Sequence, residues 1–162
     1  MRHMQNTALE KIVVNAGIGR LSQQANFQEK VLPEVTKEFA LITGQKPTMR
    51  AARQSIAGFK LRAGAIIGLK ATLRGRRQQQ FLEKLVKVAL PRLRDFRGID
   101  LKSVDENGNL TIGIKEQHIF PEISPESSFY DFGLEVTVVP KFRNRERAIE
   151  FYRNLGIPLK KS

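Results

Sequence analysis

Several stretches of the chain alternate between apolar and polar residues, which is the pattern of a β-strand with one buried and one exposed face. They are residues Leu9–Asn15, Ile67–Leu73, Leu110–Ile114 and Leu134–Val138. Gly17 and Gly19 follow the first stretch and predict a turn at its end, and the pair Asn107-Gly108 predicts a hairpin turn before the third. The polar side of the second stretch carries Lys70 and Thr72, whose positive charge and hydroxyl group are suited to binding RNA.

Other segments repeat their apolar residues with the period of an amphipathic helix. The first runs from Phe27 to Ile42 with Gly44 as its expected end, and Pro33 should kink it or begin a second helical piece. Two more helices are expected, one over residues 77–89 ending near Pro91, the other following Asn144 as N-cap and closed by Gly156 and Pro158.

Strands and helices follow one another in mixed order, without the regular strand-helix repeat of a parallel doubly wound sheet. We therefore predict an α+β fold, with a mainly antiparallel sheet and helices packed on one face. The length of 162 residues predicts a single domain over residues 1–162.

The charge of the chain predicts a polyanionic partner, because 28 Lys and Arg against 16 Asp and Glu give a net charge of +12. Nucleic acid and anionic membrane both qualify, but no apolar stretch approaches the ~20 residues that a bilayer helix needs, so no membrane is expected. Between Glu38 and Glu83 the chain has nine basic residues and no acid, whereas residues 104–139 hold seven acids and one lysine. This asymmetry favours one face toward nucleic acid and another toward solvent or a basic partner protein.

Enzymatic chemistry is not expected from this sequence. Gly17 and Gly19 match only the start of a dinucleotide-binding fingerprint, since Ser22 takes the place of its third glycine, and we expect no cofactor. The chain has no cysteine, and an isolated histidine such as His118 is more often structural than catalytic. A metal-dependent enzyme acting on nucleic acid would need carboxylates near the basic surface, and the basic segment has none.

Linked motifs in the chain resemble the bacterial form of large-subunit ribosomal protein number five. They are, in order, residues 42–47, 52–62, 67–75, 91–98 and 116–123. The resemblance covers about residues 9–138 well and the C-terminal helix in outline, while residues 124–132 depart from the family pattern. The family normally begins with a helix of ~20 residues, and we expect that usual N-terminal helix to be absent because the chain starts too close to its first strand.

The resemblance implies that one face of the antiparallel sheet binds 5S rRNA. The family's polar contacts match Asn15, Gln45 and Thr72, and nearby cations that would hold phosphate are Lys11, Lys46, Lys70 and Arg74. Further expected partners are large-subunit rRNA and neighbouring ribosomal proteins, on a ribosome of the cytoplasm or of an organelle.

The resemblance also implies two contacts beyond 5S rRNA. A protruding basic loop at about residues 50–65 would reach the peptidyl-site tRNA through Arg50, Arg53, Gln54, Ser55, Phe59, Lys60 and Arg62. Segments 91–104 and 116–135 would bridge to a basic protein of the small-subunit head, through Arg92, Arg94, Arg97, Glu122 and Glu126.

The main alternative from the residues alone is a free-standing RNA-binding regulator or chaperone that uses the same basic sheet. It predicts only modest discrimination among RNAs, so selectivity for 5S rRNA separates the two hypotheses.

Overall fold

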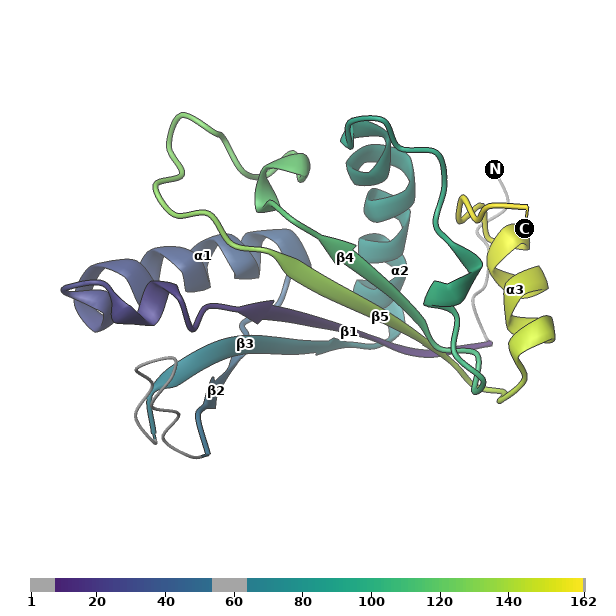
Figure 1. Ribbon diagram of the computed structural model, residues 1–162, viewed down its shortest axis with the longest axis horizontal. Helices are drawn as coiled ribbons and strands as arrows, with labels where there is room; N and C mark the ends of the chain where they lie inside the picture. The colour runs from purple at the N-terminus through teal and green to yellow at the C-terminus, as the bar shows by residue number, and fades with distance from the viewer. Residues whose placement is uncertain (1–7, 54–63, 162) are drawn as a thin grey trace.

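The computed structural model describes residues 8–53 and 64–161 and has an α+β fold (Figure 1). Its sheet contains β1 (Leu9–Gly17), β2 (Thr48–Ala51), β3 (Ile66–Leu73), β4 (Leu110–Ile114) and β5 (Leu134–Pro140). The strands lie in the order β2-β3-β1-β5-β4, and every neighbouring pair is antiparallel. This arrangement confirms the predicted fold class.

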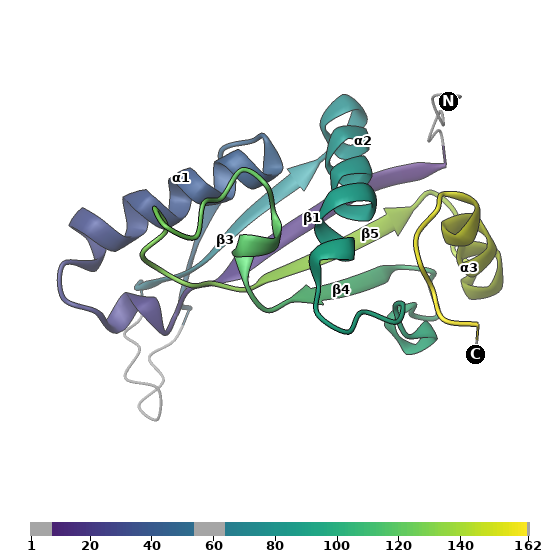
Figure 2. The ribbon, with the colours of Figure 1, turned by 90° about the horizontal axis from the view of Figure 1, so that it is seen from above.

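The helices are α1 (Leu32–Thr43), α2 (Gly75–Lys84) and α3 (Arg145–Asn154). Two π-helical turns cover Phe27–Val31 and Leu85–Ala89, and 3-10 turns cover Leu21–Gln23, Leu90–Arg92, Leu101–Ser103 and Gln117–Ile119. Figures 1 and 2 show α1 and α2 lying across the same face of the sheet, while α3 packs at one end of it.

The first predicted helix is confirmed as two consecutive pieces. The π-helical turn passes directly into α1, and Pro33 lies in the first turn of α1, where its fixed φ suits a helix start. Gly44 ends α1 with a left-handed φ of 75°, which its lack of a Cβ makes easy.

The structure differs from the sequence predictions in two places. Helix α2 begins at Gly75, not at Arg77, and its regular part ends at Lys84, after which the chain continues through the π-helical and 3-10 turns. The apolar pattern alone could not locate this start, because the first residues of α2 are small or charged and exposed. Strand β2 was not predicted, since all four of its residues are exposed and show no alternation.

The hydrophobic core lies between the sheet and α1 and α2. Strands contribute alternate side chains such as Val14, Leu73 and Val136, and the helices contribute Phe39 and Phe81, all buried. The opposite side chains of the same strands form the second face of the sheet, which none of the described helices covers. This uncovered face is where a large partner could lie flat on the protein.

Candidate RNA-binding face

The open face is defined as the side chains that alternate with the core along the sheet. They are Lys11, Val13, Asn15 and Gly17 of β1, Gly68, Lys70 and Thr72 of β3, Glu135, Thr137 and Val139 of β5, Thr111 and Gly113 of β4, and Thr48 and Arg50 of β2. Most are polar, small or basic, so the face offers hydrogen-bonding groups together with positive charge.

Strand register fixes the neighbours on this face. Asn15 lies opposite Lys70 of β3 on one side and opposite Glu135 of β5 on the other. Thr72 lies opposite Val13, and Lys11 lies opposite Val139. The structure thus brings four predicted site residues, Lys11, Asn15, Lys70 and Thr72, onto one face, while their role in RNA binding stays a prediction.

Gln45 lies at the edge of the sheet and is half-buried. Its Nε2 donates to the backbone oxygen of Thr72 at 3.2 Å, and its Oε1 accepts from Nη1 of Arg77 at 3.0 Å. These hydrogen bonds anchor the loop after α1 to β3 and place Arg77, which was not among the residues predicted to bind RNA, beside the predicted site. Lys46 and Arg74 lie on the adjoining loop and at the end of β3, and Arg74 is exposed.

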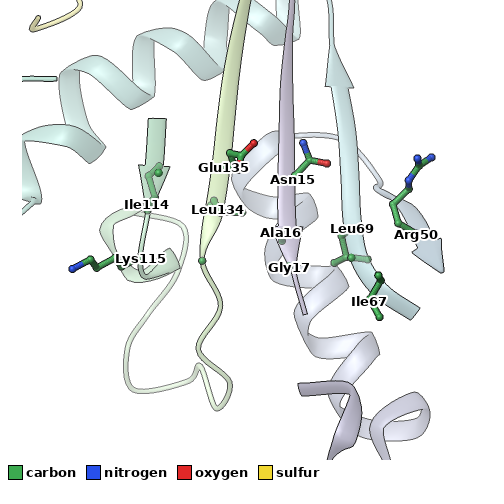
Figure 3. A pocket seen from close by; sticks show the side chains of 13 residues that line it. Asn15, Ala16, Gly17, Arg50, Ile67, Leu69, Ile114, Lys115, Leu134 and Glu135 are labelled. Carbon is green, nitrogen blue, oxygen red and sulfur yellow. The ribbon is translucent and has the colours of Figure 1, made fainter. Parts of the chain in front are cut away.

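A groove of about 720 Å³ crosses one end of the open face. Asn15 and Glu135 lie side by side in it, with Arg50 on one flank and Lys115 on the other (Figure 3). Arg50 was expected in the protruding loop but belongs to β2, opposite Gly68, because the β2–β3 ladder reaches further along the chain than its sequence pattern suggests. Glu135 and Lys115 were not among the predicted RNA-binding residues.

The predicted protruding loop connects the antiparallel strands β2 and β3. At its base the Ala52 N–H donates to the Ala65 oxygen at 2.7 Å, and the Gly64 N–H donates to the Ala52 oxygen at 2.9 Å. Arg53 is exposed at this base. The other loop residues selected from the sequence, Gln54, Ser55, Phe59, Lys60 and Arg62, lie outside the described residues.

The segments expected to form the intersubunit bridge lie on the helix side of the sheet, except that residues 134–135 already belong to β5 (Figure 1). Arg92, Arg94, Arg97 and Glu126 are exposed there. Glu122 is already engaged within the protein, because its carboxylate lies 2.8 Å from Nζ of Lys84. Lys84 also donates to the backbone oxygen of Ile42, so this pair ties the 117–123 segment to α1 and α2.

Two kinds of feature were not found among the described residues. None of the helices in residues 8–53 and 64–161 is long and apolar enough to cross a membrane. Within the same residues, no group of three or more His, Asp or Glu side chains is placed to hold a metal ion.

Comparison with known proteins gives one family over nearly the whole chain. Residues 3–62 match the family described as "Ribosomal protein L5", and residues 66–159 match the model that describes the C-terminus of the same ribosomal family. A protein of Spiroplasma kunkelii named "Large ribosomal subunit protein uL5" is 47% identical over 158 residues, which cover 98% of this chain and 86% of the relative. The protein of the same name from Lacticaseibacillus casei is 48% identical over the same shares of both chains.

Proposed function

Because the chain belongs to the ribosomal protein L5 family, whose members are structural and non-enzymatic constituents of the large ribosomal subunit, we propose that it binds 5S rRNA through the open face. Family membership makes it a ribosome-bound protein with rRNA and other ribosomal proteins as partners. The choice of 5S rRNA and of the open face is our proposal.

The observation that carries this proposal is the clustering of Asn15, Thr72, Lys11 and Lys70 on a sheet face that no described helix covers. Amide and hydroxyl groups can bond to sugars and base edges, while ammonium groups attract phosphate. Both kinds of group project from a rigid ladder, so their relative positions are set before RNA arrives, which lowers the entropy lost on binding.

The proposal is tested by titrating the protein with 5S rRNA and with an unrelated structured RNA of equal length, at two salt concentrations. Phosphate attraction weakens steeply as salt rises for both RNAs, whereas contacts to particular bases and shapes persist. We expect a preference for 5S rRNA that widens at the higher salt. Equal affinity at both concentrations would instead favour the general RNA-binding regulator or chaperone.

Replacing Asn15 or Thr72 with alanine is expected to weaken 5S rRNA binding by about threefold to tenfold each, since one hydrogen bond contributes ~0.5–1.5 kcal/mol. The control is Lys87→Ala, which removes a positive charge on the helix side, where Lys87 pairs with Glu83. Filter-binding or anisotropy titrations would measure all three. Equal losses in the three variants would mean that bulk charge alone drives binding.

We further propose the two contacts that the family resemblance implies. The β2–β3 hairpin would carry its basic loop to the peptidyl-site tRNA, supported by Arg53 exposed at the base of that loop. The helix-side segments would meet a basic protein of the small-subunit head. Since Glu122 is paired with Lys84, Glu126 is the better candidate of the two acids for that contact.

A further inference from the structure

One carboxylate interrupts the otherwise basic and neutral ladder of the open face. Glu135 is exposed and stands between Asn15 of β1 and Gly113 of β4. None of the ion pairs found among the described residues includes it. A bare carboxylate repels phosphate, so its presence on a face proposed to bind RNA calls for a contact with a part of the RNA other than its phosphate backbone.

The glycines around Glu135 supply a second, independent observation. Gly113 and Gly17 both line the groove, and neither has a positive φ. A Cβ built on either would meet nothing within 4 Å. By contrast, Gly68 and Gly133 in the same groove are constrained by packing, since a Cβ there would lie 3.3 Å and 3.0 Å from backbone oxygens.

Glycine inside a strand weakens the strand and often marks a β-bulge or a place where another molecule approaches the backbone closely. The register between β4 and β5 is regular at Gly113, so no bulge accounts for this glycine. The bare backbone at Gly113 lies next to the Glu135 carboxylate, and Gly17 leaves similar space along β1 beyond Asn15. The groove therefore offers a flat floor beside a hydrogen-bond acceptor, which is the shape and chemistry that a planar base requires.

The identity of the base follows from the acceptor. A carboxylate has two adjacent oxygens and donates nothing when ionised. Among the four RNA bases only guanine presents two adjacent donors, N1–H and the N2 amino group, on its Watson–Crick edge. Cytosine and adenine place an acceptor beside their amino group, and uracil places two carbonyls around its N3–H, so each of these bases offers a carboxylate only one donor, next to an acceptor that repels its second oxygen.

Resting on the proposed binding of 5S rRNA, we infer that this groove reads one unpaired guanine, with Glu135 accepting hydrogen bonds from N1 and N2 while the ring lies over Gly113. Asn15 borders the same pocket, and Lys115 and Arg50 on its two flanks attract the phosphates on either side of the splayed nucleotide (Figure 3). Glu135 is thus a specificity-determining residue whose negative charge favours one base.

The Glu135→Gln variant separates recognition of a base from an effect of bulk charge, because the two predict opposite changes in affinity for RNA. If only charge mattered, removal of an acid from the RNA-binding face would tighten binding. We expect instead about tenfold weaker binding to 5S rRNA, the loss typical of one good bidentate base contact. Glu150→Gln, which removes an exposed acid from α3, is the matched control and should leave affinity unchanged. Tighter binding by the Glu135→Gln variant would overturn the inference.

Chemical footprinting identifies the base directly. Kethoxal modifies N1 and N2 of unpaired guanines, so the wild-type protein should protect a guanine of 5S rRNA that the Glu135→Gln protein, at saturating concentration, leaves reactive. The same pattern of guanine protection with both proteins would overturn the inference. If the wild type shows no preference for 5S rRNA over unrelated RNA, the proposed function itself fails, which is a different result.

The Gly113→Ala variant tests the floor of the pocket. Its thermal midpoint should not fall, because the added methyl group meets no atom of the protein and alanine is less flexible than glycine in the unfolded chain. Its affinity for 5S rRNA should nevertheless fall severalfold, since the methyl group keeps the ring off the backbone. Unchanged affinity would contradict the placement of the base over Gly113.

Discussion

Replacing Gln117 with leucine is expected to destabilise the protein by about 3–5 kcal/mol, although the two side chains are similar in size. Gln117 is fully buried, and both ends of its amide are engaged. Its Oε1 accepts from the Phe132 N–H at 3.1 Å. Its Nε2 donates to the Tyr130 oxygen at 2.5 Å and lies 3.2 Å from both the Ser128 hydroxyl and the Glu38 carboxylate, either of which can accept its second hydrogen.

Leucine would leave the Phe132 N–H and the Tyr130 oxygen without the partner that Gln117 gives them, and each unpaired group costs ~1–3 kcal/mol. Because these groups belong to the segment that crosses from the 3-10 turn at residues 117–119 to β5, the same change should loosen that segment over α1. Urea denaturation measures the effect, and a slope of ~2 kcal/mol per molar predicts a midpoint lower by roughly 1.5–2.5 M.

The matched control for this change is Gln80→Leu, a glutamine-to-leucine change on the exposed side of α2, which should stay within ~0.5 kcal/mol of the wild type. If the two variants unfold at the same urea concentration, the buried amide does not stabilise the fold as we argue.

Replacing Gly108 with alanine is expected to lower stability by about 2–4 kcal/mol through two separable effects. Gly108 has a φ of 86°, which opposes any residue with a Cβ by ~1–2 kcal/mol. A Cβ there would also lie 2.9 Å from the Cβ of Ala148 and 3.2 Å from the Asn144 oxygen, so α3 would have to move away from the hairpin.

That movement would also disturb a buried hydrogen bond. The Tyr152 hydroxyl donates to the Gly108 oxygen, and burial, followed by the charge of Asp105, raises the pKa of this hydroxyl above its ordinary value, which keeps it a donor.

Gly156→Ala is the matched control for Gly108→Ala. Gly156 has nearly the same φ, 85°, but a Cβ there would meet nothing within 4 Å. Thermal unfolding of the two variants therefore isolates the steric part of the effect. A loss at Gly108 no larger than that at Gly156 would show that α3 accommodates the methyl group freely.

Local features of the fold were predictable because they depend on residues close together in sequence. Strand alternation identified β1, β3, β4 and β5, since adjacent side chains of a strand point to opposite faces. Gly44 and Asn144 marked a helix end and a helix start, and the Asn144 side chain does accept from the Arg147 N–H. In the same way, Lys70 and Thr72 were assigned correctly to the polar side of one strand.

Tertiary structure decided which of these strands became neighbours. Nothing in the local pattern revealed β2, whose four residues are all exposed and which pairs only because β3 offers it an edge. The buried role of Gln117 was equally hidden, because its partners come from α1 and from the segment before β5.

The open face shows most clearly which features follow from the sequence alone and which require the tertiary structure. The sequence by itself determined a basic chain, whose charge predicts a polyanionic partner, and a two-sided sheet, because charge and alternation are properties of the residues in order. It placed Glu135 in an acidic segment and Asn15 at the end of a distant strand. Only the register between β1 and β5, set by burial of one face of each strand against the helices, brings that carboxylate beside the asparagine.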